Sequence, residues 1–261
     1  MEVVVVENPS TGAALVGDAI AALLAAKPQA VLGLATGSTP LPVYDDLAAR
    51  YERGEISFAQ ARGFALDEYV GLPEGHPESY RAVLDREIVG RVDFAPDAVQ
   101  TPDGWSDDPR GACLSYDFAI TAAGGIDLQI LGVGTDGHIG FNEPTSSLAS
   151  PTRIKTLTQQ TREDNARFFD DDLSQVPHHV LTQGIGTILR ADHLVLLAWG
   201  SNKAQAVAAT VEGPVTAMVP SSALQLHPHA TVVVDEAAAA ELSHLEYYRH
   251  VFANKPTWQG L

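Results

Sequence analysis

The sequence predicts an α/β fold whose sheet is doubly wound, Rossmann-like and mostly parallel, with helices on both faces. Short β-branched or aliphatic runs alternate with alanine-rich amphipathic segments, which is the order expected of strand–helix units. Several of these short runs are apolar throughout, as in strands that are covered on both faces. A chain of 261 residues can form one large α/β domain or two small ones. Because no linker, repeat or low-complexity tract interrupts it, we expect residues 1–261 to form a single domain.

The expected elements follow from this alternation. Strands are predicted at Val3–Val6, Val31–Leu34, Gly63–Leu66, Asp127–Leu131, Leu194–Ala198 and Thr231–Val234. Helices are predicted at Gly12–Ala26, Leu41–Arg50, Glu78–Ile88, Asp108–Ala123, Thr161–Phe169, Val180–Leu189 and Asn202–Thr210. The tail from about Tyr247 fits neither pattern. Ligands of doubly wound folds bind at the carboxyl ends of strands, so a site is expected in the segments that follow the predicted strands.

Composition excludes several classes of protein. The single cysteine, Cys113, excludes an internal disulfide and suits a reducing compartment. The N-terminus lacks the basic start and apolar run of a signal peptide, and no stretch approaches the roughly 20 apolar residues of a membrane span. The net charge of −17 repels nucleic acid, acidic membranes and phosphorylated metabolites alike. We therefore expect a cytoplasmic protein without nucleic-acid or membrane partners, in which any phosphate site needs backbone amides and a few well-placed bases.

The first candidate segment is LGLATGSTPLPVYDDL, from Leu32 to Leu47, where a strand runs into a helix through small residues. Gly37 lets the backbone approach an anion, and the helix start supplies unpaired N–H groups and the positive end of its dipole. Ser38 and Thr39 add hydroxyl donors or cap the helix. The segment lacks the GK[ST] signature of a P-loop. Anion binding and a merely well-capped helix are equally open from this segment alone.

The second segment, FALDEYVGLP, places Asp67 directly after an apolar strand. An acid in that position sits where doubly wound folds do their chemistry. If burial raises its pKa, the carboxyl group can act as a general base. A solvated turn acid is the alternative that the local sequence favours.

The third segment, LGVGTDGHIGFNEP, contains the dinucleotide-binding spacing G-x-G-x-x-G. That interpretation fails because Gly140, Pro144 and Pro151 leave no room for the helix that must follow. What remains is an irregular loop that displays Asp136, His138 and Glu143. Histidine can take and give a proton near neutrality, and flanking carboxylates can orient its ring. We therefore favour a catalytic role over a structural histidine in a turn.

The fourth segment, LVLLAWGSNKAQAVAAT, repeats the strand–glycine–helix pattern of the first and adds Lys203 in the first helical turn. A lysine there opposes the helix dipole unless an anion neutralises it, which favours a phosphate contact. Arg167 is a second basic candidate, although alone it would be a solvated helix residue. The remaining histidines show no ligand spacing on a recognisable scaffold, so we expect no metal site. The sequence contains no G-x-S-x-G elbow, which argues against a serine hydrolase.

Taken together, the motifs resemble the glucosamine-6-phosphate deaminase family, also called the glucosamine/galactosamine-6-phosphate isomerase family. The resemblance covers about Val31 to Glu236 and is carried, in order, by LGLATGSTP, LDEYVGLPEGHPESY, LGVGTDGHIGFNEPTSSLASPTRIKT, TREDNARFF, LTQGIGTIL and SNKAQAV. DGHIGFNEP together with LDEYVGL is highly specific. The related 6-phosphogluconolactonases share a glycine-rich DGH loop, but neither the FNEP continuation nor the DEY motif.

The resemblance implies a modified doubly wound sheet and a cofactor-free conversion of glucosamine 6-phosphate and water to fructose 6-phosphate and ammonia. It implies that His138 assists ring opening, that Asp136 and Glu143 hold and tune His138, and that Asp67 moves a proton from C2 to C1. Phosphate contacts are implied for a set of residues that overlaps the candidate anion-binding groups above: Gly37, Ser38, Thr39, Gly134, Arg167 and Lys203.

Some members of the family are hexamers activated by N-acetylglucosamine 6-phosphate at subunit interfaces. The residues that match this effector site are Ser146, Ser147, Arg153, Lys155 and Thr156, with Tyr247 as a match that requires two residues to be dropped after Glu236. The Arg153-x-Lys155 pair favours a regulated homo-oligomer. Pro151 stands where that branch commonly carries arginine, and simple members work without an effector.

Two alternatives remain open from the sequence alone. A 6-phosphogluconolactonase would use a related scaffold, but it needs no base for proton transfer between C2 and C1. A non-catalytic sugar-phosphate sensor of the kind found in transcription regulators would want a DNA-binding segment, and the chain shows no basic helix-turn-helix. The sequence does not distinguish glucosamine from galactosamine 6-phosphate.

Overall fold

The computed structural model describes residues 1–261, apart from the side chain of Thr257. Its main sheet has seven parallel strands in the order β1-β10-β9-β6-β2-β3-β5. The strands are β1 (Glu2–Val6), β2 (Val31–Leu34), β3 (Arg62–Ala65), β5 (Val99–Gln100), β6 (Leu128–Gly132), β9 (His193–Ala198) and β10 (Ala230–Asp235). All six predicted strands are present in this sheet. The predicted α/β class and mostly parallel sheet are confirmed.

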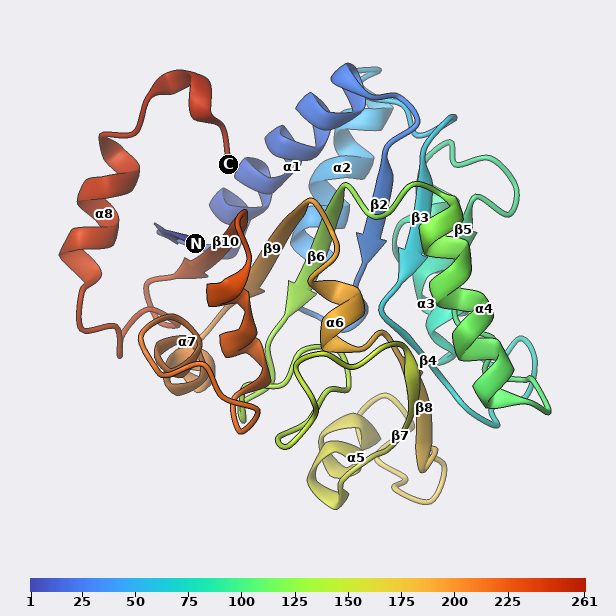
Figure 1. Ribbon diagram of the computed structural model, residues 1–261. Helices are drawn as coiled ribbons and strands as arrows, with labels where there is room; N and C mark the ends of the chain where they lie inside the picture. The colour runs from blue at the N-terminus through green and yellow to red at the C-terminus, as the bar shows by residue number, and fades with distance from the viewer.

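Helices lie on both faces of this sheet, with α1 and α2 on one face and α4 and α6 on the other (Figure 1). The helices are α1 (Pro9–Ala26), α2 (Leu41–Glu52), α3 (Tyr80–Glu87), α4 (Pro109–Ala122), α5 (Gln159–Ala166), α6 (Ile185–Ile188), α7 (Ala204–Val211) and α8 (Leu245–Ala253). Four short 3-10 segments join them: η1 (Val89–Arg91), η2 (Ser201–Lys203), η3 (Pro220–Leu226) and η4 (Thr257–Gln259).

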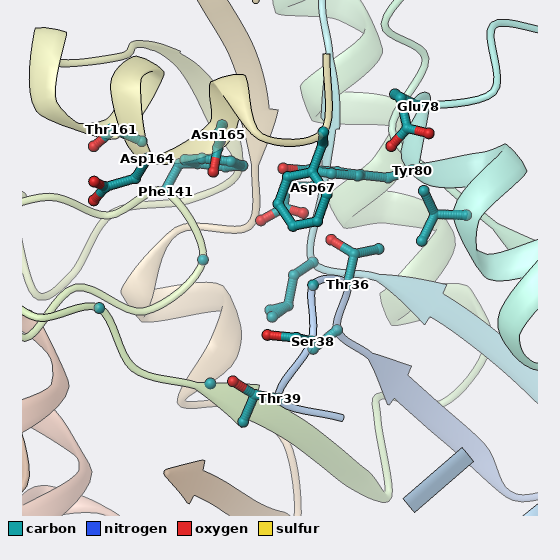
Figure 2. Close-up of a pocket in the computed structure, with 18 of the residues that line it drawn as sticks. Thr36, Ser38, Thr39, Asp67, Glu78, Tyr80, Phe141, Thr161, Asp164 and Asn165 are labelled. Carbon is teal, nitrogen blue, oxygen red and sulfur yellow. The ribbon is translucent and has the colours of Figure 1, made fainter. Parts of the chain in front are cut away.

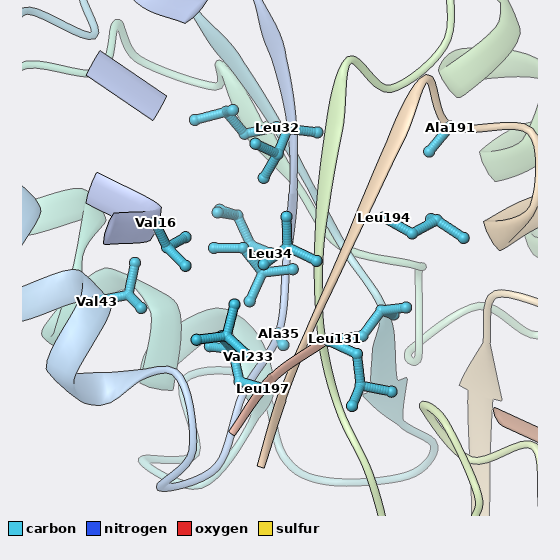
Figure 3. Close-up of a cluster of buried hydrophobic side chains, with 14 of the residues drawn as sticks. Val16, Leu32, Leu34, Ala35, Val43, Leu131, Ala191, Leu194, Leu197 and Val233 are labelled. Atoms are coloured by element: carbon cyan, nitrogen blue, oxygen red, sulfur yellow. The ribbon is translucent and has the colours of Figure 1, made fainter. Parts of the chain in front are cut away.

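The hydrophobic core lies between the sheet and these helices. Leu34, Leu131 and Leu197, from three neighbouring strands, are 2% exposed or less. Figure 3 shows them beside Val16 of α1 and Val43 of α2, which are also fully buried. Burial of each such side chain contributes roughly 1.5–3 kcal/mol. The packed sheet is therefore a rigid base for the loops that leave its carboxyl edge.

Among the described residues, one helix is long and apolar enough to cross a membrane, judged by length and composition alone. This helix is α1. No such segment was expected from the sequence. In this fold α1 packs against α2 and β10, and it buries Val16 and Ile20 completely. The Asn8 side chain caps its start by accepting a hydrogen bond from the Thr11 N–H at 3.0 Å. These contacts account for its apolar face as part of the core.

A second, smaller sheet is antiparallel and has the order β4-β8-β7. It consists of β4 (Asp67–Tyr69), β8 (His179–Thr182) and β7 (Arg153–Thr156), and in Figure 1 it lies below the main sheet beside α5. The predicted helix at Val180–Leu189 is wrong in its first half, because Val180, Leu181 and Thr182 pair with both neighbouring strands. Only α6 of that prediction is helical.

The C-terminal tail, which no sequence pattern assigned, contains α8 and packs beside β1. The carboxylate of Glu212 holds its start by accepting hydrogen bonds from the N–H groups of Ser243 and His244, both at 2.9 Å. Lys255, just beyond α8, donates to both carboxylate oxygens of Glu2 at 2.7 and 2.9 Å. The tail thereby lies along the outer edge of the main sheet.

Candidate functional site

The candidate site is a cavity of about 300 Å³ where β2, β3 and β6 end. Its hydroxyl, carboxyl and imidazole groups come largely from the segments that follow these strands, whereas the cations Arg167 and Lys203 come from the end of α5 and from η2 after β9. The residues that bear on its chemistry are Thr36, Gly37, Ser38, Thr39, Asp67, Glu78, Tyr80, Gly134, His138, Phe141, Asp164, Asn165, Arg167 and Lys203. Figure 2 shows Asp67 between the β2–α2 hydroxyls and the side chains of α5. The cavity occupies the carboxyl-end position expected of a doubly wound fold.

Asp67 is the first residue of β4 and only 5% exposed. Burial raises its pKa well above the ordinary value, and the charge of Glu68 raises it further. The structure thus differs from the solvated turn acid that the local sequence favoured. A buried carboxyl group with a raised pKa, facing a cavity, is suited to exchange protons with a bound molecule near neutral pH.

His138 and Asp136 form a pair on the loop after β6. Imidazole Nδ1 lies 2.7 Å from Oδ1 of Asp136, and the same oxygen accepts a hydrogen bond from the His138 N–H at 3.1 Å. Burial raises the pKa of Asp136, but the hydrogen bond and charge of His138 outweigh it and hold that pKa below its ordinary value. Asp136 therefore stays ionised and orients the ring, so that its other nitrogen is free to exchange a proton.

Two glycines of this loop are required by its geometry. Gly137 has φ +84°, a left-handed conformation that side chains other than glycine rarely adopt. A Cβ atom on Gly134 would overlap the His138 ring. The glycines that suggested a dinucleotide site thus serve to seat an imidazole.

The hydrogen bonds of Glu143 go to the start of α5, and its implied role toward His138 stays a prediction. Its carboxylate accepts hydrogen bonds from the hydroxyls of Thr158 and Thr161 and from the Thr158 N–H, so it fastens the start of α5. Among the described side chains, the carboxylate beside His138 is that of Asp136. Glu143 is 6% exposed and does not line the cavity. Its contact with α5, which carries cavity residues, places it next to the site.

Cations stand together at one side of the cavity. Lys203 is the last residue of η2, and Arg167 is the C-cap of α5. Burial lowers the pKa of Lys203, and the nearby positive charge of Arg167 lowers it further. The two neighbouring cations repel each other, and a dianion bound between them would relieve that repulsion. Both residues were predicted as phosphate contacts.

The predicted β2–α2 anion loop forms the neighbouring wall. Gly37 has φ +85°, and Ser38 and Thr39 line the cavity ahead of α2. The indole N–H of Trp199, at the end of β9, donates to the carbonyl of Thr39 at 2.9 Å. This hydrogen bond ties the first and fourth predicted segments together, so their hydroxyl and cationic groups face one space.

Several cavity residues were not predicted from the sequence. Tyr80 and Glu78 come from the start of α3, Phe141 from the DGHIGF loop, and Asn165 from α5. Asn165 donates to the hydroxyl of Tyr69 at 2.9 Å, which connects α5 to β4. The motifs LDEYVGLPEGHPESY and TREDNARFF contained three of these residues. These three residues do not follow a predicted strand, so the expectation of a site at strand ends did not select them.

The predicted effector residues lie on three segments of the chain: the loop after Glu143, strand β7 and helix α8. Ser146 is 3% exposed, and Ser147 lies in the exposed turn that follows it. Arg153 donates to the side-chain oxygen of Asn142 at 2.7 Å, and Lys155 and Thr156 lie further along β7, the edge strand of the small sheet. Tyr247 is 63% exposed and belongs to α8, a helix that lies well apart from β7 in Figure 1.

Metal-binding groups are not clustered in the part of the chain that the structure describes. Its residues contain no group of three or more His, Cys, Asp or Glu side chains that could hold a metal ion. The side chains that line the cavity include the buried carboxyl group of Asp67, the oriented imidazole of His138 and several hydroxyls. They also include the carboxylates Glu78, Glu87 and Asp164 and the cations Arg86, Arg167 and Lys203.

Comparison with known proteins agrees with this geometry. The model of the family described as glucosamine-6-phosphate isomerases/6-phosphogluconolactonase matches residues 9–234. A glucosamine-6-phosphate deaminase of Streptomyces avermitilis is 64% identical over the full length of both chains, and one of Mycolicibacterium smegmatis is 62% identical, also over both full lengths.

Solved structures add the fold. A monomeric glucosamine-6-phosphate deaminase of the NagB superfamily superposes with a TM-score of 0.90 at 38% identity, covering 92% of this chain and 100% of that one. The 6-phosphogluconolactonase of Trypanosoma brucei superposes with a TM-score of 0.73 at 17% identity over 93% and 98% of the two chains, which shows a shared fold only. The chain belongs to the glucosamine-6-phosphate isomerase/6-phosphogluconolactonase family.

Proposed function

We propose that the protein is a deaminating aldose–ketose isomerase that converts glucosamine 6-phosphate and water to fructose 6-phosphate and ammonia. The observation that carries the proposal is the cavity itself. It brings a buried carboxyl group, Asp67, and an imidazole oriented by a carboxylate, His138, within one space that also holds the cations Arg167 and Lys203. The full-length relatives named as glucosamine-6-phosphate deaminases support the same activity.

The first step we propose is ring opening by His138. Its free nitrogen takes the proton of the C1 hydroxyl and returns a proton to the ring oxygen, so the pyranose opens to the aldehyde. Asp136 keeps the ring oriented for both transfers. Glu143 acts indirectly, because its hydrogen bonds hold the start of α5 beside the cavity.

The second step is proton transfer by Asp67. As the carboxylate it removes the proton from C2 while the aldehyde oxygen at C1 takes up a proton from water, which gives an enolamine. As the acid it then returns a proton to C1. The product of this transfer is a ketimine at C2, to which water adds, and ammonia leaves. Arg167, Lys203, Ser38 and Thr39, with backbone N–H groups near Gly37 and Gly134, hold the phosphate throughout.

An ammonia-release assay with glucosamine 6-phosphate tests this proposal directly. Wild-type protein should release ammonia and fructose 6-phosphate in equal amounts without added nucleotide. Asp67→Asn should abolish the reaction, because an amide cannot take the C2 proton. If the protein hydrolysed 6-phosphogluconolactone instead, and Asp67→Asn left that activity intact, the lactonase alternative would replace the proposal. Binding of the amino-sugar phosphate without turnover would indicate a sensor. Galactosamine 6-phosphate, run in parallel, decides the C4 configuration.

Regulation is the second part of the proposal. We propose that N-acetylglucosamine 6-phosphate activates a homo-oligomer, of the kind formed by hexameric members of the family, through Ser146, Ser147, Arg153, Lys155 and Thr156. Since Tyr247 belongs to α8, which lies well apart from β7 of the same chain (Figure 1), it can join such a site only from a neighbouring subunit. The structural relative at 38% identity is described as monomeric, so the oligomer needs its own test. Light scattering for mass, and saturation curves with and without the acetylated sugar, provide it.

A cytoplasmic location is the third part. The net charge, the lone thiol of Cys113 and the metabolite substrate all favour it. Fractionation of the source cells, followed by the ammonia assay on each fraction, tests this location.

A further inference from the structure

Glu68, the neighbour of Asp67 on β4, is buried to 1% exposure yet lies outside the cavity. Successive side chains of a strand point to opposite faces, so the two carboxyl groups leave β4 on opposite sides. Asp67 faces the cavity, whereas Glu68 faces the start of α3. A buried carboxylate that contacts no substrate requires an explanation.

The Glu68 carboxylate is held by three backbone N–H groups. Oε1 accepts from Tyr69 and Tyr80, both at 2.8 Å, and Oε2 accepts from Arg81 at 2.9 Å. Tyr80 and Arg81 are the first two residues of α3, whose N–H groups have no partner within the helix. Burial raises the pKa of Glu68, while these donors oppose the shift by stabilising the ionised form.

No cation neutralises this carboxylate among the ion pairs of the described residues. The guanidinium of Arg81 turns away and pairs with Asp85. The negative charge therefore acts on Asp67 through the low-dielectric interior of the protein. It favours the protonated form of Asp67, in the same direction as burial does.

The same hydrogen bonds connect β4 to a wall of the cavity. Tyr80, Val83, Arg86 and Glu87 of α3 all line it. If the carboxylate no longer held the first turn of α3, that wall would lose its attachment to the strand that carries Asp67. Glu68 thus acts on the site through both geometry and charge.

We propose that Glu68 is a positioning residue for the deamination, which fixes the α3 wall and whose charge sets the pH range in which Asp67 transfers a proton. This inference rests on the proposed function for its kinetic readout. The negative charge of Asp67 contributes to the raised pKa values of three nearby hydroxyls, those of Tyr69, Tyr80 and Tyr116. Burial raises the pKa of Tyr69 to about 12 and moves the pKa of the other two well above the ordinary value, so all three stay neutral in the working range. The other titratable or charged side chains that share the cavity of Asp67 are Glu78, Arg86, Glu87, His138, Asp164, Arg167 and Lys203.

Two substitutions separate the effect of the charge of Glu68 from the effect of its hydrogen bonds to α3. Glu68→Gln keeps the length of the side chain and removes its charge, whereas Glu68→Asp keeps the charge and shortens the reach to α3. The acidic limb of the kcat/KM profile reports the pKa of the base in the free enzyme. We expect Glu68→Gln to move this limb to lower pH by about one unit, since a like charge has been removed from beside Asp67. Glu68→Asp should leave the limb in place and raise KM.

Glu212→Gln is the matched control, because Glu212 also accepts two backbone N–H groups at a helix start but lies far from the cavity. It should leave the pH profile unchanged. Titration of the substrate's own amino and phosphate groups is common to all variants and cancels in the comparison. The proposal is overturned if Glu68→Gln leaves the limb in place or if Glu68→Asp shifts it equally.

Infrared difference spectroscopy provides a measurement that needs neither turnover nor a folded Glu68→Gln variant. Spectra of wild type minus Asp67→Asn, taken across the pH range, isolate the carboxyl band of Asp67. In wild type and in Glu68→Asp that band should titrate well above the ordinary value of an aspartate, because burial and the charge of residue 68 both favour the protonated form. Titration at the ordinary value overturns the role of Glu68 even if the protein turns over glucosamine 6-phosphate. Lack of turnover with a raised titration would reject the proposed function alone.

Discussion

Acidification from pH 7.5 to pH 5 should lower the free energy of unfolding by about 2 kcal/mol through a single imidazole, that of His193. This side chain is at the start of β9 and is 7% exposed. Its ring stacks on that of His229, with centroids 3.6 Å apart and planes 4° from parallel. Its Nε2 lies 2.9 Å from the hydroxyl oxygen of Thr231. The ring is therefore held as a neutral group in a largely buried site.

The magnitude follows from the proton affinity in the two states. Burial first, and then the nearby groups His229, His227 and Lys255, lower the pKa of His193 from 6.5 to about 3. Between these two values the unfolded chain binds a proton that the folded chain does not. The contribution to stability is therefore complete above pH 6.5 and is lost as the pH falls toward 3. At pH 5, about 1.5 units below 6.5, the loss is about 2 kcal/mol at 1.36 kcal/mol per unit.

Urea unfolding of wild type and His193→Gln, at pH 7.5 and at pH 5, measures this loss. Asp67 and Glu68 titrate in the opposite sense, because their pKa values are raised. They are common to both proteins, so the difference between wild type and variant isolates His193. As the pH falls from the higher to the lower value, the free energy of unfolding of the variant should rise by about 2 kcal/mol relative to that of wild type. The exposed His178, changed to Gln, is the control and should gain nothing.

The reasoning is refuted if the difference between wild type and His193→Gln is the same at both pH values. A constant difference would mean that His193 binds a proton equally well in the folded and unfolded chains. It would also mean that the stack with His229 tolerates a charged ring.

Three further predictions concern the cavity. Lys203→Ala should raise KM for glucosamine 6-phosphate on the order of tenfold while changing kcat less, because a charge-assisted phosphate contact is lost; an unchanged KM would locate the anion site elsewhere. His138→Gln should lower kcat on the order of a hundredfold with the melting temperature unchanged, because ring opening loses its proton carrier; a large fall in melting temperature would indicate a structural histidine. Gly134→Ala should lower kcat in the same way, since the new Cβ would displace the His138 ring, and normal kinetics would show that the ring position is not critical.

The sequence predicted the main sheet well, for a physical reason. Strands such as Val31–Leu34 are buried on both faces, so an uninterrupted apolar run identifies them without knowledge of their partners. The small sheet was missed because its strands are short and antiparallel. Val180–Thr182 is apolar enough for helix or strand, and only its pairing with β4 and β7, far apart in sequence, decides for strand.

The residues of the site fall into the same two groups, those that a local sequence pattern predicts and those whose role depends on contacts between distant segments. Residues in the segments that follow well-predicted strands, such as Asp67, His138 and Lys203, line one cavity as expected, because topology alone brings strand ends together. The function of Glu68 depends on where α3 starts in space, which no local pattern reports. The contact of Glu143 with α5 likewise depends on a fold of the chain between residues 143 and 158 that the motif does not encode.

The packing of α8 beside β1 has a consequence for the behaviour of the molecule at high concentration. β1 is the outermost strand of the main sheet, and its sequence, EVVVV, is the kind that readily accepts a further strand. The backbone donors and acceptors along that border would be open to another molecule without the helix fastened over it by Glu212 and by the Lys255–Glu2 pair. Helix α8 therefore prevents the β1 strands of two molecules from pairing with each other. A protein shortened after Leu242 should aggregate and precipitate, even with its catalytic residues intact.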